Sequence, residues 1–260
     1  MLSNVKVSII TVAYNAESSI RDAIESVVSQ RYKNIEYIII DGNSSDQTLS
    51  IIREYSDKIQ SVVSEPDNGI YDAMNKGIVA ATGDIIGILN ADDFYANSRV
   101  ISDVVSEFQN NLDLDVIIGK MVYVDFSDKD KVVRSYNSER FCPWKLRFGW
   151  MPPHLATFIK KSVYDDVGLY SQEYKIAADY EMFVRIFLIR HVNYTKIDKI
   201  LVKMRLGGIS TSGIRSNLII GAEMVKACKS NGVYTNIFFV MSRLPLKAME
   251  LIRKPRKLIN

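Results

Sequence analysis

The sequence predicts an α/β protein in which helices flank a largely parallel sheet. Apolar, β-rich segments alternate with amphipathic helical segments four times within about 110 residues, which is the rhythm of a doubly wound sheet. The first of these strands, at residues 5–14, is nearly apolar on both faces, as a strand covered by helices on both sides must be. Beyond about residue 115 strands follow one another without intervening helices, so we expect a mixed second half.

Each unit of the first half follows the same logic. Residues 5–14 (VKVSIITVAY) predict a central strand. Residues 16–30 predict a helix, because their apolar side chains recur at helical spacing. That apolar face consists of Ile20, Ala23, Ile24, Val27 and Val28. The pattern recurs in strands at 35–41, 59–65 and 84–89, with helices near 46–56, 69–81 and 97–109.

The second half is less regular. Residues 115–127 and 131–136 predict strands, and residues 148–168 mix loop, strand and short helix. Helical periodicity returns at about 179–190 and 214–230. The segment between these helices, LGGISTSG at 206–213, has the glycine and hydroxyl residues of a mobile loop, which could close over a ligand and exclude water.

The charge of the chain is distributed unevenly along its length. A hydrophobic content of 47% with 24% charged residues is ordinary for a globular protein. Residues 213–260 carry 9 Lys+Arg and 2 Asp+Glu, a balance of +7. The totals of 33 and 30 then leave 24 and 28 for residues 1–212, a balance of −4. Because the basic residues are confined to the end of the chain, a nucleic-acid partner is a poor fit.

Cysteine usage and the N-terminal sequence bear on the compartment. Cys142 and Cys228 are too few and too far apart for a disulfide framework, so buried reduced thiols are expected. The N-terminus has no basic region followed by an apolar run and a cleavage site, and no stretch is apolar enough to span a membrane. We therefore expect a cytoplasmic protein.

Acidic residues follow every predicted strand of the first half. In open α/β sheets ligands bind beyond the carboxyl ends of the strands. The residues found there are 14–17, 41–43, 65–69 and 90–93, and each segment brings an acid to the same rim. Asp46 or Asp67 alone is equally compatible with a helix cap or a turn. The four together predict a polar ligand site.

The adjacent acids Asp92 and Asp93 point to a metal ion. They follow an apolar run, where two neighbouring carboxylates repel each other and lose solvation. The chain has no Gly-x-Gly-x-x-Gly after its first strand and no P-loop, and its two histidines and distant cysteines argue against zinc. A carboxylate-rich rim suits Mg2+ or Mn2+ carrying a diphosphate.

Four segments together resemble the inverting glycosyltransferases of family 2, particularly enzymes that build bacterial O-antigens and capsules. They are VSIITVAYNAE (7–17), IIIDGNSSDQT (38–48), the run from SEPDNG to NADD (64–93) and KIAADYEMFVRI (175–186). The resemblance covers roughly residues 4–210. It implies a GT-A fold, a Rossmann-like mixed sheet flanked by helices, in a catalytic domain of residues 1–212. Residues 1–115 would be its nucleotide-binding half and residues 116–212 its acceptor-binding half.

The resemblance also implies a site for a UDP-sugar donor. Asp41 would accept a hydrogen bond from uracil, Tyr14 and Asn15 would line the base and ribose pocket with Glu17 nearby, and Asp92 with Asp93 would match the metal and ribose site. Asp67 belongs to the same nucleotide-sugar rim. Lys76 follows the matching residues DAMN and would face the phosphates, although a solvated helix lysine is equally compatible. The sequence departs from the family pattern at Asn90, where the family has the first acid of an Asp-x-Asp motif.

Asp179 matches the general base of the family. It would deprotonate the acceptor hydroxyl while UDP departs, and an α-linked donor would give a β-linked product. Ala178 stands where family members often have Glu. Asp179 also precedes a helical pattern, and a helix-capping position is compatible with catalysis. His154 and Trp150, from FGWMPPHLATF, would contact acceptor or donor, with a structural histidine and a core or lid tryptophan as the alternatives.

The final segment suggests a membrane partner. Residues 235–260 interleave apolar residues with six basic ones, and such a segment can lie on an anionic surface. The basic residues are Arg243, Lys247, Arg253, Lys254, Arg256 and Lys257. A helical segment at 213–260 would then hold the enzyme at the inner face of the plasma membrane, near a polyprenyl-diphosphate-linked glycan acceptor. The alternative is a helix packed on the catalytic domain with a basic end.

Two other functions are alternatives to this one. A noncatalytic sugar-nucleotide-binding subunit of a polysaccharide assembly complex is suggested by Asn90 and Ala178. A sugar-nucleotide pyrophosphorylase would share a related α/β core, but it normally has a glycine-rich N-terminal loop with a basic residue. The corresponding residues here, TVAYNAESS (11–19), lack both features.

Overall fold

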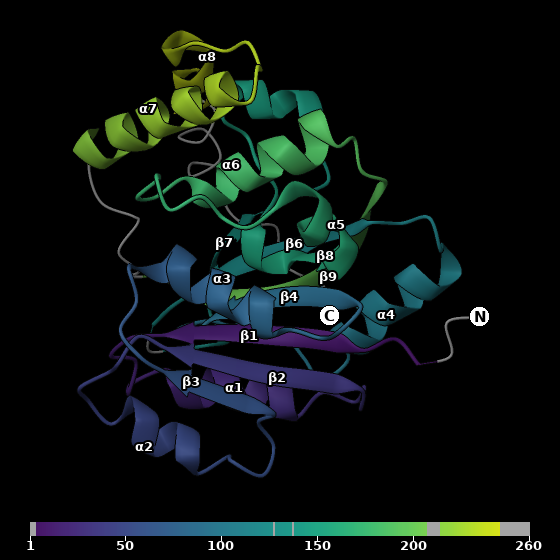
Figure 1. The fold of residues 1–260 in the computed structure, drawn as a ribbon, viewed down its shortest axis with the longest axis vertical. Coiled ribbons are helices and arrows are strands. Elements are labelled where there is room, and N and C mark those ends of the chain that lie inside the picture. The colour runs from purple at the N-terminus through teal and green to yellow at the C-terminus, as the bar shows by residue number, and fades with distance from the viewer. Residues whose placement is uncertain (1–3, 127, 137, 207–213, 245–260) are drawn as a thin grey trace.

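One nine-stranded sheet runs through the computed structural model, which describes residues 4–126, 128–136, 138–206 and 214–244 (Figure 1). Its strand order is β3-β2-β1-β4-β8-β6-β9-β5, and β7 pairs with β6 outside this path. The strands are β1 (Val7–Ala13), β2 (Ile35–Asp41), β3 (Ser61–Ser64), β4 (Ile85–Asn90), β5 (Phe94–Tyr95), β6 (Val116–Val124), β7 (Val132–Tyr136), β8 (Thr157–Lys160) and β9 (Tyr194–Arg205).

The first half forms the predicted parallel core. In register, Val7 of β1 lies between Ile35 of β2 and Ile85 of β4, and β2 pairs in parallel with β3. Every residue of β1 is buried, which requires cover on both faces of the sheet. The four connecting helices are α1 (Ile20–Val28), α2 (Thr48–Arg53), α3 (Ile70–Ala80) and α4 (Val100–Asn110). Each lies within the range that the sequence predicts, apart from one extra residue at the end of α4.

Gly77 lets α3 lie directly against the central strand. A Cβ at this position would lie 2.3 Å from Cγ2 of Ile10, so any other residue would push the helix away from β1. The close approach matters for function, because the first turn of α3 borders the rim where the parallel strands end.

A buried charge cluster ties β1, β2 and β4 together at their amino ends. Glu36 accepts hydrogen bonds from Lys6 Nζ at 2.7 Å, Ser8 Oγ at 2.5 Å and Thr82 N at 2.7 Å. Burial by itself would raise the pKa of Glu36, but these hydrogen bonds outweigh it and lower that pKa to about 2. Glu36 is therefore a structural carboxylate, at the opposite end of the strands from the acidic rim.

The second half continues the same sheet with mixed strand directions. β8 is antiparallel to both β4 and β6, β7 is antiparallel to β6, and β9 is parallel to β6. The predicted division at residue 115 therefore falls inside one sheet. β9 was not predicted from the sequence. Its residues, YTKIDKILVKMR, carry charges throughout because only its β6 side is paired along most of its length.

Helices cover the upper end of the molecule in Figure 1. The remaining helical elements of the second half, some beside the sheet and some at this end, are the 3-10 helices η1 (Pro143–Phe148) and η2 (His154–Ala156), α5 (Lys161–Val167), α6 (Ala178–Val184) with a π-helical continuation η3 (Arg185–Ile189), α7 (Ile214–Ser230) and α8 (Ile237–Met241). α7 packs on α6, and α8 packs on α7 and η1. Gly221 permits the α7–α8 contact, since a Cβ there would lie 3.2 Å from Met241 Sδ and 3.3 Å from Ile237 Cδ1.

The structure corrects one part of the predicted basic tail. Arg243 is buried, and its guanidinium donates a hydrogen bond to Gly149 O at 2.8 Å. This residue therefore packs on the catalytic domain and cannot face a membrane. Residues 245–260, and all of the predicted 206–213 loop except Leu206, lie outside the described residues.

Cys228 is buried as expected, whereas Cys142 is half-buried, and both thiols are free. Across the described ranges, no helix combines the length and the apolar character needed to cross a bilayer.

Candidate active site

Three of the predicted nucleotide-site residues meet at the carboxyl ends of β1 and β2. A Cβ added to Gly42 would lie 2.5 Å from Asp67 Oδ2 and 3.4 Å from the Tyr14 ring. Asp41, the last residue of β2, is adjacent in the chain. Only glycine leaves room for both neighbours, so the sequence Asp41-Gly42 brings the rim together at this point.

Asp41 is fully buried and both of its oxygens are engaged. Oδ2 accepts from Ser44 N at 3.0 Å and from Ser64 Oγ at 2.7 Å, while Oδ1 accepts from Ser44 Oγ at 2.5 Å. The carboxylate therefore holds the β2–α2 loop against the end of β3. Each oxygen has further lone pairs, so the same group can still accept from a ring N–H.

Tyr14 and Asn15 follow β1 on the exposed side of this loop. Asn15 adopts a left-handed backbone conformation with φ 47°, which asparagine tolerates better than most residues. Its N–H donates to Ser44 Oγ at 2.8 Å, and its Oδ1 accepts from Ser45 N at 2.9 Å. The turn leaves the Tyr14 side chain 68% exposed, in position for a planar base to stack on it.

Glu17 supports the site from behind. Its carboxylate accepts from Gln47 N at 2.9 Å at the start of α2, and its own N–H donates to Asp46 Oδ2 at 3.0 Å. A carboxylate at a helix N-terminus is favourable. The structure thus gives Glu17 a local role in shaping the loop that carries Ser44.

Asp67 and Lys76 are both tied to the β3–α3 loop. Asp67 Oδ1 accepts from Gly69 N at 2.8 Å in a tight turn. Lys76 pairs with Glu65 at 2.8 Å, donates to Pro66 O at 2.9 Å and lies 3.8 Å from Asp72. A phosphate contact by Lys76 therefore requires this lysine to exchange one of its partners.

Asp92 and Asp93 differ sharply in environment. Asp92 is half-buried at the end of β4, whereas Asp93 is fully buried. Asp93 Oδ1 accepts from Arg205 N at 3.2 Å, and Oδ2 lies 3.4 Å from Asn90 Nδ2. Both oxygens of Asp93 thus have neighbours in β9 and at Asn90, and its role as a metal ligand stays a prediction.

Arg205, at the end of β9, supplies positive charge to this acid pair. Its guanidinium donates to Asp92 O at 2.8 Å, forms an ion pair with Asp22 and lies 5.0 Å from the centre of the Phe94 ring. Burial raises the pKa of Asp92, and the charge of Arg205 acts in the opposite sense. Burial and the charge of Asp92 raise the pKa of Asp93 well above its usual range. Arg205 was not predicted from the sequence, because it lies more than a hundred positions from Asp92 along the chain.

The donor atoms present fit a hard divalent cation. Asn90 Oδ1 is buried and has no hydrogen-bond partner among the described residues, because the amide nitrogen is turned toward Asp93. Together with the half-buried Asp92 carboxylate it offers two oxygen ligands. Mg2+ and Mn2+ accept such a set when substrate phosphates and water complete it. The part of the chain that the structure describes contains no cluster of three or more His, Cys, Asp and Glu side chains arranged for a metal ion, so protein ligands alone do not form a cage.

Asp179 lies in the first turn of α6, next to the start of α3. Its Oδ1 accepts from Tyr180 N at 2.8 Å and lies 3.3 Å from the Tyr71 hydroxyl, which also donates to Ile176 O. Burial raises the pKa of Asp179 to about 6, although the hydrogen bonds from Tyr180 N and Tyr71 lower it. The carboxylate is thus more basic than an ordinary aspartate and remains mostly ionised at pH 7.

Glu223 on α7 fixes the backbone that leads into α6. Its carboxylate accepts from three consecutive backbone N–H groups, those of Lys175 at 3.0 Å, Ile176 at 3.0 Å and Ala177 at 2.9 Å. Its charge also contributes to the raised pKa of Asp179. The helical spacing of residues 214–230 predicted the helix, but nothing in it pointed to a link with Asp179, so Glu223 was missed.

Two tyrosines of β6 and β7 are within electrostatic reach of the acidic positions. The charge of Asp93 contributes to raising the pKa of Tyr123, and that of Asp179 contributes to raising the pKa of Tyr136, both after the larger effect of burial. Arg134 stacks on Tyr123 at 5.5 Å, and within the described ranges its buried Nε has no hydrogen-bond partner. Each acidic position thus has a tyrosine within electrostatic reach, and Arg134 beside Tyr123 is a cation that was not predicted from the sequence.

His154 is held by aromatic neighbours. Its Nε2 lies 2.7 Å from the Tyr170 hydroxyl, and its ring packs edge-on against Tyr170 and Phe183. Burial lowers the pKa of His154 to about 4, so the ring is neutral near pH 7. These contacts favour the structural alternative for His154. Trp150 is half-buried beyond η1, and its role in binding stays a prediction.

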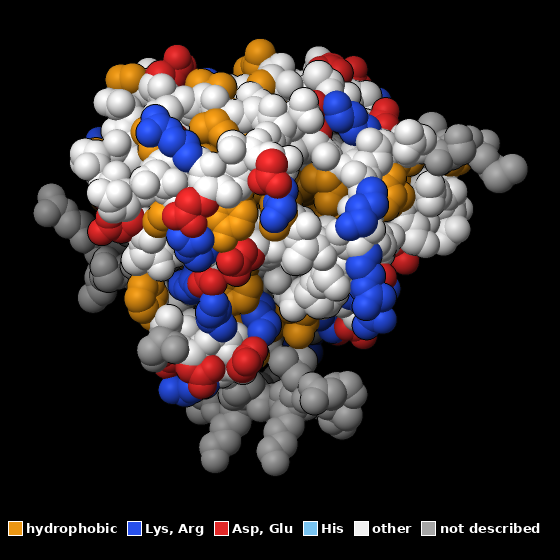
Figure 2. Space-filling view, turned by 90° about the horizontal axis from the view of Figure 1, so that it is seen from below, with side chains coloured by type: hydrophobic (Ala, Val, Ile, Leu, Met, Phe, Trp, Pro, Cys, Tyr) orange, Lys and Arg blue, Asp and Glu red, His pale blue; other side chains and the backbone are white. Residues whose placement is uncertain are grey.

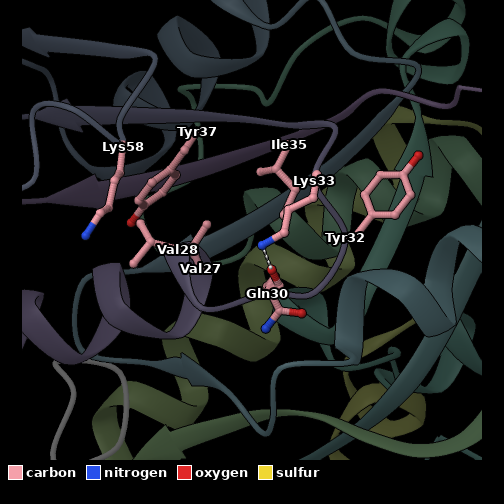
Figure 3. A pocket seen from close by; sticks show the side chains of 8 residues that line it. All are labelled: Val27, Val28, Gln30, Tyr32, Lys33, Ile35, Tyr37 and Lys58. Atoms are coloured by element: carbon pink, nitrogen blue, oxygen red, sulfur yellow. Dashed lines mark hydrogen bonds between the residues drawn. The ribbon is translucent and has the colours of Figure 1, made fainter.

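A cavity of about 220 Å³ lies away from this site (Figure 3). It opens between the end of α1 and the start of β2, where Val27, Ile35 and Tyr37 form its wall. The amino end of β2 is the end opposite Asp41. None of the predicted site residues lines this cavity, so we assign the active site to the rim.

Comparisons with known proteins point in one direction. The family model described as glycosyl transferase family 2 matches residues 8–167. The chain is 28% identical over 219 residues to an uncharacterized glycosyltransferase of Mycobacterium tuberculosis, covering 84% of this chain and 79% of that one. It is 26% identical over 186 residues to a PGL/p-HBAD biosynthesis glycosyltransferase of Mycobacterium bovis, covering 69% of each chain.

Solved structures share the fold at lower sequence identity. S. aureus TarS in complex with UDP-GlcNAc gives a TM-score of 0.62 at 18% identity, covering 85% of this chain and 66% of that chain. The mannosyltransferase PcManGT from Pyrobaculum calidifontis, in complex with GDP-Man and Mn2+, gives 0.67 at 14% identity, covering 96% and 74%. These similarities establish the predicted GT-A fold of the chain.

Proposed function

Since this chain belongs to glycosyl transferase family 2 and is a glycosyltransferase, we propose that it transfers a sugar from a UDP-sugar to a hydroxyl group of a lipid-diphosphate-linked glycan. The product would be a β-linked bacterial surface polysaccharide, O-antigen or capsule, made at the inner face of the plasma membrane. Because the chain belongs to a family of enzymes, we do not keep the alternative of a noncatalytic sugar-nucleotide-binding subunit. The observation that carries the proposal is the basic, partly exposed Asp179 carboxylate at the start of α6.

The donor would bind along the ends of β1 to β4. Tyr14 offers a ring for stacking, and Asp41 accepts the uracil N–H from a carboxylate already fixed by serines. Asn15 and Asp67 would face the ribose. A nucleotide-sugar donor agrees with the UDP-GlcNAc and GDP-Man found in proteins of this fold.

The diphosphate would lie beside Asp92 and Asn90. These two side chains would hold Mn2+ or Mg2+. The bound ion would neutralise the charge that builds up on the departing diphosphate, which removes the need for a protonated leaving group. The buried Arg205 adds fixed positive charge behind the same acids.

Asp179 would take the proton from the attacking hydroxyl. A sugar hydroxyl is a weak nucleophile near neutral pH, and a positioned base typically contributes about 10²- to 10⁴-fold in rate. The fixed loop before α6 and the Tyr71 hydroxyl hold the carboxylate in place. Attack opposite the leaving group inverts the anomeric centre.

A screen of UDP-sugars against lipid-diphosphate acceptor analogues tests the proposal. We expect one UDP-sugar to be turned over in the presence of Mn2+, with activity lost on chelation by EDTA and restored by added metal. GDP-sugars in the same screen serve as the matched control. Turnover of a GDP-sugar in preference to every UDP-sugar would overturn the donor assignment, and EDTA-resistant transfer would overturn the metal.

Replacing Glu223 by Gln is expected to move the acidic limb of the pH profile to lower pH. Asp179 must be deprotonated to act, so kcat/KM should fall as pH drops through about 6 in the wild type. The E223Q variant removes a negative charge that raises this pKa but keeps an oxygen that can accept backbone hydrogen bonds. In E223Q the plateau value of kcat/KM should fall less than about tenfold. In E223A it should fall further, because the segment before α6 loses the side chain that holds it.

The pH profile of kcat/KM measures this effect, with E173Q as a control. Glu173 is an exposed carboxylate that pairs with Lys226 of α7, and its charge is screened by solvent. Removing the charge of Glu173 should therefore leave the acidic limb of the pH profile where it is. An unshifted limb in E223Q would show that Glu223 does not act on the base.

A further inference from the structure

We propose that the surface formed by η1, the α7–α8 turn and α8 is the face that docks this enzyme on an anionic lipid bilayer. The inference rests on the proposed lipid-linked acceptor and adds the surface that reaches it. This aromatic face is defined by four large apolar side chains that are exposed to solvent. They are Trp144 (57%), Tyr234 (66%), Ile237 (38%) and Phe238 (81%).

The aromatic face is backed by a rigid layer of rings. Trp144 packs edge-on against Phe148 at 5.7 Å, Phe148 stacks on Phe239 at 4.8 Å, and Tyr234 packs edge-on against Phe239 at 6.1 Å. Residues from η1, from the α7–α8 turn and from α8 therefore share one cluster. Because this layer fixes the backbone, Phe238 and Trp144 stay exposed at a free-energy cost in water.

Cations accompany the exposed rings. Lys145 Nζ lies 5.8 Å from the centre of the Trp144 ring, and the Arg147 guanidinium lies 5.7 Å from that of Tyr234. Aromatic rings beside basic side chains are the composition of an interfacial, membrane-bound surface. Charge complementarity therefore favours an anionic bilayer over an electrically neutral apolar partner.

The chain outside the structure continues the same chemistry. The described residues end at residue 244, shortly after α8, and the sequence goes on for residues 245–260. In that stretch Glu250 is outnumbered by basic residues. The basic residues are Lys247, Arg253, Lys254, Arg256 and Lys257. The positive charge of this stretch adds to the attraction of the chain for anionic headgroups.

The opposite end of the molecule has a different character. Figure 2 shows that end, where acidic and basic side chains lie side by side among scattered hydrophobic ones. Arg21 and Glu54, which pair at 2.7 Å between α1 and α2, are an example. Mixed charges of this kind give no net attraction to an anionic surface. The molecule is thus polarised along its long axis, with the aromatic face at the α7–α8 end (Figure 1).

Direct contacts join the aromatic face to the proposed base. The Tyr180 hydroxyl donates to Leu146 O in η1, and Tyr180 N donates to Asp179. Arg147 Nε also donates to Tyr234 O at 2.8 Å. η1 is thus held against the first turn of α6, the helix that carries Asp179, so the aromatic face and the proposed base belong to one packed layer.

Fluorescence of Trp144 tests the docking surface directly. The chain has two tryptophans, so W150F leaves Trp144 as the sole reporter. On adding phosphatidylglycerol vesicles we expect a blue shift and quenching by brominated acyl chains, and with phosphatidylcholine vesicles a much weaker response. Raising the salt concentration should reduce the response.

Co-sedimentation with the same vesicles supplies the mutational arm. In otherwise wild-type protein, replacing Trp144 and Phe238 together by Ser should weaken binding by about tenfold or more. V79S is the matched control, because Val79 is 71% exposed but lies on α3, and its binding should be unchanged. The double variant should retain transfer to a soluble acceptor, so failure of docking is distinguishable from failure of the proposed reaction.

Three results would overturn the inference. One is an unaltered Trp144 spectrum with anionic vesicles, and another is full vesicle binding by the double variant. The third is a blue shift that depends on protein concentration without vesicles, which would assign the face to a second copy of the chain.

Discussion

The D179N variant is expected to lose about 10²- to 10⁴-fold in kcat while it keeps its affinity for the UDP-sugar within about twofold. Asn has the same shape as Asp and retains an oxygen that can accept from Tyr180 N and Tyr71, so the loop before α6 should be undisturbed. What it loses is the ability to take a proton. Initial-rate assays with saturating acceptor, paired with calorimetric titration of the donor, measure the two quantities separately.

The control for D179N is the same substitution at an exposed aspartate of another helix. D165N removes an exposed Asp that pairs with Lys161 on α5, and it should leave kcat unchanged. If D179N retained turnover at the wild-type rate with an intact fold, Asp179 would have no catalytic role.

The D92N variant is expected to lower transfer by about 10²- to 10³-fold and to abolish its dependence on Mn2+. Asp92 is the one half-buried carboxylate beside the unpartnered Asn90 oxygen in the described part of the chain, so removing its charge leaves two neutral oxygens. Mn2+ titrations of activity and of donor binding check this. The midpoint of thermal unfolding should stay close to that of the wild type.

D93N separates metal binding from structure. Asp93 is buried and accepts from Arg205 N, so its replacement should lower the unfolding temperature and affect the metal only indirectly. A D93N enzyme that folds normally but loses its response to Mn2+, beside a D92N enzyme that keeps it, would reverse the two assignments.

The sequence was sufficient to predict the strands and helices of the parallel half of the sheet, because the buried central strands leave continuous apolar runs in the sequence. The strand expected at 84–89 is β4, Ile85–Asn90, and the helix expected near 69–81 is α3, Ile70–Ala80. β9 could not be found in this way. It is a strand with charges at both exposed and half-buried positions, and only its pairing with β6 defines it.

The rim could be predicted because parallel strands end together. Gly42 shows that Asp41, Asp67 and Tyr14 do meet there. The partners of these residues could not be predicted, because they come from distant segments. Arg205 reaches Asp92 from β9, and the orientation that buries Asp93 follows from that contact.

The residues around the proposed base were harder still to predict from the sequence. Glu223 and Tyr71 act on the Asp179 segment from α7 and α3, and neither residue type is distinctive on an amphipathic helix. Arg243 was expected at a membrane because basic residues usually remain solvated, yet a carbonyl acceptor within the packed η1–α8 layer accommodates it.

The most direct test of the central claim measures donor affinity and transfer rate on D179N and D92N in parallel, with and without Mn2+. If the metal-bearing diphosphate site and the base are separate parts of one cleft, D179N will bind the UDP-sugar normally with Mn2+ and fail to transfer, while D92N will lose the metal-dependent part of binding as well. Normal transfer by either variant, or loss of donor binding in D179N alone, would contradict this account.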